Sequence, residues 1–114
     1  MNHALSIAII GVGGIGSNVA ALLIPSLSQG DLATKFENIK INLYDSDEVE
    51  ESNIFHQRFF PSNIGEKKVN ATYRNLKCFE NGRLEIIPHA KDVRNKQEIV
   101  DNDLIVVCVD SSEA

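Results

Sequence analysis

Apolar residues follow two different rhythms along this chain, and the rhythm changes from one segment to the next. Four short runs, continuous or alternating in their apolar positions, predict β-strands over residues 5–10, 39–44, 84–88 and 104–109. Three longer segments predict helices over residues 15–28, 64–79 and 94–101. Strands that alternate with helices favour right-handed crossovers, so the pattern predicts an α/β fold with a mainly parallel sheet of about four strands.

Local signals refine these elements. Pro25 falls in the last turns of the first helix, where it predicts a kink or a stop. Asn63 stands three residues before Glu66, a spacing typical of the capping box that begins a helix. The near-continuous apolar run over residues 104–109 predicts a buried strand. The polar segment over residues 45–60 is too long for a simple turn and predicts a functional loop with one or two helical turns.

A glycine-rich turn joins the first strand to the first helix. Its sequence, Gly11-Val-Gly-Gly-Ile-Gly-Ser17, follows a β-branched run and precedes a helical apolar pattern. In this context glycines let backbone N–H groups approach a phosphate, so we expect Gly11, Gly13, Gly14 and Gly16 to bind a nucleotide. The alternative is a turn kept only for close packing of strand and helix. The expected architecture is a three-layer α/β/α, Rossmann-like, doubly wound sheet.

Acidic residues follow two of the predicted strands. Asp45 comes after the second strand, where a carboxylate typically accepts hydrogen bonds from ribose hydroxyls; the alternative is a solvated loop acid. Asp47 is a second candidate or a local turn-former. Asp110 comes after the fourth strand and is a candidate ligand for Mg²⁺ bound to phosphate oxygens, or a helix N-cap. Because ligands bind beyond the carboxyl ends of parallel strands, we expect these residues to converge on one pocket.

Three basic residues are candidates for phosphate contacts. Lys68, in the first turns of the second predicted helix, could reach back to a phosphate, although a surface lysine beside Lys67 is the alternative. Arg58 could clamp the β- and γ-phosphate oxygens. His56 could do so only when protonated, which is partial near neutral pH.

Composition narrows the class of protein. The chain has 114 residues, which suits a single domain over residues 1–114. Its net charge of −5, with no basic tract, argues against nucleic acid as a partner. No apolar run approaches the length of a membrane span, and the start lacks the features of a signal peptide, so we expect a cytoplasmic protein. Cys78 and Cys108 form no CxxC pair, which disfavours a zinc site within this chain.

The motifs occur in an order that resembles the ThiF/MoeB adenylation family, bacterial relatives of ubiquitin-activating enzymes. After the glycine motif the chain carries Asp45-Ser-Asp-Glu-Val, Ser52-Asn-Ile-Phe-His-Gln57, Ile64-Gly-Glu-Lys-Lys68 and Val109-Asp110. The resemblance spans residues 7–114, nearly the whole chain. It implies ATP and Mg²⁺ as cofactors, and adenylation of the C-terminal carboxylate of a ubiquitin-like or sulfur-carrier protein that ends in Gly-Gly. It also implies a homodimer.

The same resemblance implies a role for each matching residue. The glycine loop and Lys68 would hold phosphates, Asp45 the ribose and Asp110 the Mg²⁺. Three residues of the loop would lie at the nucleotide: Asn53, His56 and Gln57.

The chain departs from the family pattern in two places. His56 stands where the family has an arginine, so a permanent cation has become one that titrates; Arg58 could compensate. The family also continues beyond the position of Ala114 with further strands and a substrate-binding half. We therefore expect this chain to be the nucleotide-binding part, truncated at its C-terminus.

Two other functions fit parts of the pattern. An NAD(P)-dependent oxidoreductase domain shares the glycine loop and Asp45, but it needs neither Gly14 nor Lys68. A catalytically inactive nucleotide-binding interaction module fits the loss of the arginine at His56. Phe59 and Phe60 are either core residues beneath the loop or anchors of an interface.

Overall fold

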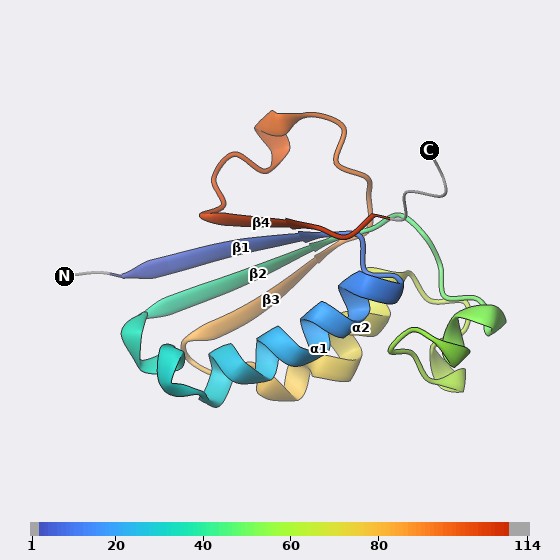
Figure 1. Cartoon of the computed structure of the whole chain (residues 1–114), viewed down its shortest axis with the longest axis horizontal. Coiled ribbons are helices and arrows are strands. Elements are labelled where there is room, and N and C mark those ends of the chain that lie inside the picture. The colour runs from blue at the N-terminus through green and yellow to red at the C-terminus, as the bar shows by residue number, and fades with distance from the viewer. Residues whose placement is uncertain (1–2, 110–114) are drawn as a thin grey trace.

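The computed structural model describes residues 3–109, in which strands alternate with helices (Figure 1). The strands are β1 (Ala4–Ile10), β2 (Asn38–Tyr44), β3 (Leu84–His89) and β4 (Leu104–Val107). The α-helices are α1 (Gly14–Gln29) and α2 (Lys68–Leu76). Short 3₁₀ turns occupy the connections: η1 (Asp31–Lys35), η2 (Glu51–Phe55), η3 (Pro61–Asn63), η4 (Lys77–Phe79) and η5 (Lys96–Glu98).

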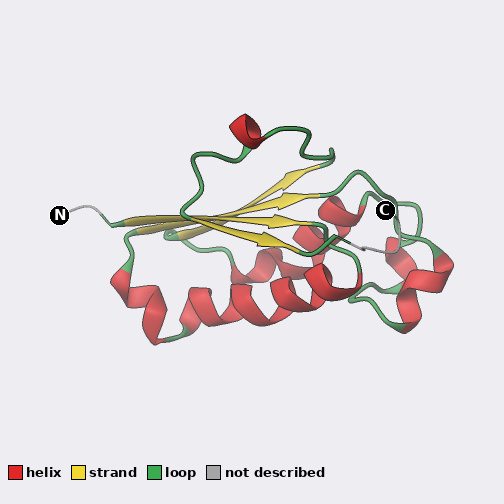
Figure 2. Ribbon diagram, turned by 45° about the horizontal axis from the view of Figure 1, so that its top comes forward, coloured by secondary structure: helices red, strands yellow, loops and turns green. Residues whose placement is uncertain are grey.

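The four strands form one parallel sheet in the order β3-β2-β1-β4. Both α-helices pack on the same face of this sheet, and the connection that carries η5 passes over the other face (Figure 2). The predicted α/β class with a parallel, Rossmann-like sheet is confirmed. Within the described residues the two faces are unequal, with the long helices all on one side.

A single apolar cluster joins the sheet to both helices. Ile9 and Ile41 from the strands, Ile24 from α1 and Val69 from α2 are fully buried in it. The helical stripe predicted for the second helix packs against the same cluster: Val69, Tyr73, Leu76 and Phe79. Since parallel strands return through helices that run antiparallel to them, this packing brings the N-termini of α1 and α2 to the carboxyl ends of the strands.

The ends of both helices differ from the sequence prediction. Helix α1 continues through Pro25 to Gln29; Pro25 removes one hydrogen bond near the helix end, and Ser26 Oγ adds a bond to the Leu22 carbonyl at 2.9 Å. Helix α2 begins at Lys68, four residues later than predicted. Asn63 does not cap it, because the buried Asn63 side chain accepts instead from the Phe60 N–H at 2.8 Å.

Two further expectations were wrong. The predicted helix over 94–101 is only the single turn η5. The predicted buried strand over 104–109 ends at Val107 and is exposed, because β4 forms an edge of the sheet and pairs only with β1 within the described residues.

The helical turn expected in the 45–60 loop is present as η2. Within residues 3–109 no helix has the length and apolar character that would let it cross a membrane.

We predict that Gly16→Ala destabilises the fold by more than about 3 kcal/mol. A Cβ at residue 16 would overlap the backbone carbonyl of Gly11, so α1 would have to move off the turn. Gly14→Ala is the matched control, since a Cβ there meets nothing within 4 Å, and it should change stability by no more than about 1 kcal/mol. Urea unfolding of both variants measures the difference. Equal stabilities would show that the helix can shift freely.

Candidate functional site

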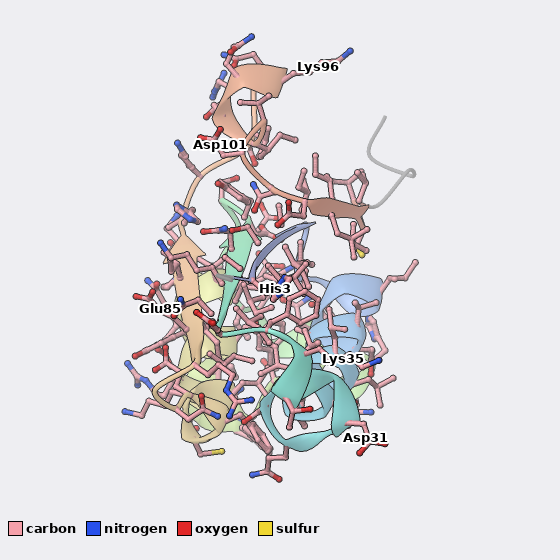
Figure 3. The ribbon with its side chains drawn as sticks, turned by 90° about the vertical axis from the view of Figure 1, so that its left-hand side faces the viewer. His3, Asp31, Lys35, Glu85, Lys96 and Asp101 are labelled. Atoms are coloured by element: carbon pink, nitrogen blue, oxygen red, sulfur yellow. The ribbon has the colours of Figure 1, made fainter. Side chains whose placement is uncertain are left out.

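The predicted site residues share one end of the described sheet. Seen from the amino ends of the strands, the charged residues Asp31, Glu85 and Lys96 lie on separate parts of the surface (Figure 3). The residues predicted from the sequence lie at the opposite end, where β1 leads into α1 and β2 leads into the long loop. The candidate site therefore lies at the carboxyl ends of the strands.

The turn after β1 is tied to the end of β2 by two hydrogen bonds. The Gly11 N–H donates to the Tyr44 carbonyl at 2.8 Å, and the Val12 N–H donates to Asp45 Oδ2 at 2.9 Å. Gly11 has φ +91°, a conformation that favours glycine. Asp45 therefore lies at the glycine turn, as predicted. Its other oxygen, Oδ1, accepts from the Asp47 N–H at 2.8 Å.

The N-terminus of α1 is open. Gly13 is the N-cap residue and offers no side-chain cap, and the first turn contains no acidic residue. The first amides of an α-helix have no partner within the helix, and they carry partial positive charge. This end of α1 is therefore available to an anion.

Lys68 faces this open helix end. The residue is 8% exposed, and its Nζ lies 3.7 Å from the point that a Cβ of Gly13 would occupy. Its nearest carboxylate within the described residues is Asp47, whose Oδ2 lies 4.0 Å from Nζ and whose side chain is exposed. The surface-lysine alternative is therefore wrong for Lys68, and it describes Lys67, which reaches the Ser46 carbonyl and Glu48 instead.

A short antiparallel pairing fixes Lys68 in place. Glu48 pairs with Lys67, and the Val49 N–H donates to the Glu66 carbonyl at 2.8 Å. The Lys68 N–H then donates to the Asp47 carbonyl at 2.8 Å. The loop after β2 thus sets where α2 begins and where the Lys68 side chain starts.

Gln57 completes this group of residues. Its side-chain amide lies 3.6–3.7 Å from the same point at Gly13, and its Oε1 is buried without a hydrogen-bond partner among the described residues. The Gln57 N–H donates to the Asn53 carbonyl at 2.9 Å. Asn53 Oδ1 accepts from the Glu50 N–H at 2.7 Å. Asn53 therefore shapes the loop that carries Gln57.

Arg58 and His56 lie differently. The Arg58 N–H donates to Ser17 Oγ at 3.1 Å, and its Nε donates to Asn18 Oδ1 at 2.5 Å. Asn18 is held in turn by the Gly14 carbonyl at 2.7 Å. Arg58 is thus fixed against the first turns of α1, while His56 is exposed at the end of η2.

The structure brings five of the predicted site residues together. Gly13, Gln57 and Lys68 face one another, and Asp45 and Asp47 border them. Asp110, the predicted Mg²⁺ ligand, lies outside the described residues. Residues 3–109 contain no group of three or more His, Cys, Asp and Glu side chains that could hold a metal ion.

Sequence analysis missed two features of the site. Asn18, which holds Arg58, stands one turn after Gly14 in α1, where an asparagine carries no recognisable motif. Tyr44 stacks on His89 with ring centroids 4.4 Å apart, and His89 Nε2 lies 3.0 Å from Asn42 Oδ1. Only the register of β2 with β3, which pairs Tyr44 with His89, could have revealed this contact.

Burial lowers the pKa of His89 below its ordinary value of 6.5, and the nearby charge of Lys91 lowers it further. The Asn42 amide nitrogen donates to Asn102 Oδ1 at 3.0 Å, so Asn42 Oδ1 faces the ring as an acceptor. His89 Nε2 therefore donates to Asn42 Oδ1, and the ring stacks on Tyr44.

These features define a nucleotide-binding domain of the Rossmann-like class. They are a parallel sheet, an open helix N-terminus after a glycine turn, a carboxylate after β2 and a buried lysine. The sequence model that describes the ThiF family matches residues 2–114 of this chain. The chain therefore belongs to the ThiF family.

Solved structures share this fold. MccB from E. coli, in a structure with ATP, has a TM-score of 0.72 and 24% identity over 94% of this chain and 30% of its own. TcdA, the E. coli tRNA N6-threonylcarbamoyladenosine dehydratase, also in complex with ATP, has a TM-score of 0.72 and 20% identity over 94% of this chain and 42% of its own. PaaA has a TM-score of 0.69 and 23% identity over 90% of this chain and 30% of its own.

These identities establish the fold and nothing finer. The chain spans less than half the length of each of these three proteins. A search of curated proteins finds no match.

We predict that His89 makes stability depend on pH. The pKa of His89 is lower in the folded chain than in the unfolded chain, so the unfolded chain binds a proton first as the pH falls. The contribution of His89 to the free energy of unfolding is therefore fully present above pH 6.5 and is lost as the pH falls below that value. His89→Phe keeps a ring to stack on Tyr44 but cannot titrate. Its unfolding free energy should therefore fall less than that of the native chain between about pH 7.5 and about pH 5.5. An NMR titration that puts the pKa of His89 above 6.5 would contradict the assignment.

Proposed function

We propose that the protein binds ATP with Mg²⁺ at the glycine turn and transfers the adenylyl group to a carboxylate. One observation carries this proposal: the ammonium of Lys68, a residue 8% exposed, faces Gly13 at the open end of α1. A buried ammonium is costly unless an anion compensates it. Asp47 reaches it only at 4.0 Å from an exposed position. A triphosphate would supply the anion, and the α1 amides would donate to it.

Each neighbouring residue has a part in this proposal. Asp45 already accepts two backbone N–H bonds, and each carboxylate oxygen keeps a lone pair for a ribose hydroxyl. Arg58, held by Asn18, presents a cation beside the first turns of α1. Asn53 offers its amide nitrogen from the loop, since its Oδ1 is already occupied. Asp110 is assigned to Mg²⁺, which would screen charge on the phosphates.

The reaction needs positioned cations and backbone donors rather than a covalent catalyst. A carboxylate oxygen forms a bond to the α-phosphorus, the bond to the bridging oxygen breaks, and pyrophosphate leaves with the electron pair. Lys68 and the α1 amides would stabilise the charge that develops on the leaving group. The product is an acyl-adenylate.

The substrate we assign is the C-terminal carboxylate of a ubiquitin-like or sulfur-carrier protein that ends in Gly-Gly. Membership of the ThiF family supports this assignment. A structure of MccB with both AMPCPP and MccA shows that a neighbour of the same fold binds a second molecule together with a nucleotide analogue. We place the reaction in the cytoplasm, in a homodimer.

A second candidate function is a nucleotide-binding interaction module without turnover. His56 stands in the place of the family arginine and is exposed. Among the described residues, the Arg58 side chain is bonded to Asn18 through Nε alone, which holds its guanidinium against α1, two residues beyond the position of the family arginine. This observation favours binding without catalysis.

Lys68→Met should weaken ATP·Mg²⁺ binding by at least about tenfold, because it removes a charge-assisted contact and keeps the buried stem of the side chain. Lys67→Met is the matched control: its ammonium bonds the Ser46 carbonyl, so the affinity should change by less than about threefold. Calorimetric titration of the full-length protein measures both. Equal losses, or tighter binding of NAD⁺ than of ATP, would contradict the proposed site.

Pyrophosphate exchange separates the two candidate functions. We expect ATP–pyrophosphate exchange that depends on a Gly-Gly-ending carrier protein and is lost in Lys68→Met. We also expect Asp110→Ala to weaken binding only when Mg²⁺ is present. If the native protein shows no exchange and His56→Arg restores it, the interaction module is the correct function.

A further inference from the structure

Lys68 and Asp47 form a loose ion pair at the candidate phosphate site. Lys68 Nζ lies 4.0 Å from Asp47 Oδ2, which is beyond the length of a hydrogen bond. The lysine side chain is 10% exposed and the aspartate side chain is 71% exposed. A buried ammonium thus faces a carboxylate that remains largely in water, and the two groups attract each other without being bonded.

The main chain of Asp47 holds this carboxylate near Lys68. The Asp47 N–H donates to Asp45 Oδ1 at 2.8 Å, and the Asp47 carbonyl accepts from the Lys68 N–H at 2.8 Å. Both bonds use main-chain atoms of Asp47, so neither depends on the charge of its side chain. The fold therefore fixes where residue 47 lies and leaves its carboxylate exposed to solvent.

The two neighbouring carboxylates have other partners. Asp45 accepts main-chain N–H bonds from Val12 and Asp47. Glu48 lies 4.0 Å from the ammonium of Lys67, which bonds to a main-chain carbonyl. Among the described residues, Asp47 is therefore the carboxylate that pairs with the ammonium facing the open end of α1.

A phosphate at the open end of α1 would replace Asp47 as the partner of Lys68. It would gain a hydrogen bond from the ammonium, which the carboxylate at 4.0 Å does not make. The displaced carboxylate would stay close by, because the main chain of Asp47 is fixed, and like charges repel. Asp47 therefore opposes an anion at this site in two ways, by pairing with Lys68 and by its own negative charge.

We propose that Asp47 is a specificity-determining residue that lowers the affinity of the site for polyphosphates, and does so more strongly for a ligand of higher negative charge. This inference rests on the proposed function, because it takes the ligand to be ATP. The magnesium complex carries about half the negative charge of free ATP near neutral pH, so repulsion by Asp47 is weaker for the complex. The site consequently selects the magnesium-bound nucleotide over the free one.

The test is calorimetric titration of the full-length protein and of its Asp47→Asn variant with ATP, once with excess Mg²⁺ and once with a chelator. Asparagine keeps the shape of the side chain and removes its charge. We expect the variant to bind ATP·Mg²⁺ about threefold more tightly than the native protein, and free ATP about tenfold more tightly, because twice the charge gives twice the repulsion.

Two results of this titration would overturn the proposal. Weaker binding of ATP·Mg²⁺ by Asp47→Asn would make Asp47 a direct ligand of the nucleotide or of Mg²⁺. Equal gains for the two forms of ATP would show that Asp47 does not discriminate by charge. A gain that persists unchanged in about 1 M salt would do the same, since salt screens an exposed charge.

Glu48→Gln is the matched control. It removes one negative charge from the adjacent residue, whose exposed side chain pairs with Lys67 instead of Lys68. Its effect on the affinity for either form of ATP should be less than about twofold. A gain equal to that of Asp47→Asn would contradict the proposal, because the net charge of the loop would then set the affinity.

A double-mutant cycle with Lys68→Met tests the pairing of Asp47 with Lys68. Asp47→Asn should gain less affinity when residue 68 is methionine, so the two changes should not be additive. Additive effects would show that the pairing has no part. Failure of the proposed function looks different: neither the native protein nor Asp47→Asn would bind ATP in either form. If both bind ATP in both forms with equal affinity, only the role given to Asp47 is wrong.

Discussion

The close approach of α1 to the turn after β1 is the constraint on which the rest of this end of the molecule depends. No side chain separates Gly16 from the Gly11 carbonyl, and Gly11 itself lies against the backbone of Cys108 beyond β4. The contact sets the helix axis so that its N-terminus opens over the carboxyl ends of the strands. The bond from the Val12 N–H to Asp45 then joins β2 to the same point. The close packing of strand and helix that one interpretation of the glycine motif expects is present at Gly11 and Gly16, and the proposed nucleotide site uses the same turn.

The electrostatics of the site are local rather than global. The chain carries a net charge of −5, and the loop after β2 is rich in exposed acids such as Asp47 and Glu48. Exposed charges are screened within about 10 Å at ordinary salt. The Lys68 ammonium is buried, so it interacts in a medium of lower dielectric constant and acts strongly over short distances. An anion at Gly13 would therefore interact more strongly with this cation and with the helix dipole than with the exposed acidic residues.

Periodicity and local motifs predicted the parts of the fold that depend on neighbours in sequence. The strands, the glycine turn and the start of α1 follow from residues adjacent to one another. The sequence could not show that Asn63 bonds to Phe60 and Asn75 instead of capping α2, because a capping motif has the same spacing in either arrangement. Nor could it show that Lys68 rather than Lys67 turns inward, since the pairing of Glu48 with Lys67 decides which side chain faces Gly13. The exposure of β4 depends on strand order, which apolar content does not encode.

The loop over residues 45–60 does more than connect β2 to α2. Asn53 closes its turn and accepts the Gln57 N–H, and the Arg58 N–H then fastens the loop to Ser17 on α1. Between these two attachments the Gln57 side chain has little freedom to move away, yet its oxygen has no partner. An unsatisfied buried acceptor costs free energy that any donor would recover. The loop thus holds the Gln57 side-chain amide, with its unsatisfied oxygen, beside the open N-terminus of α1.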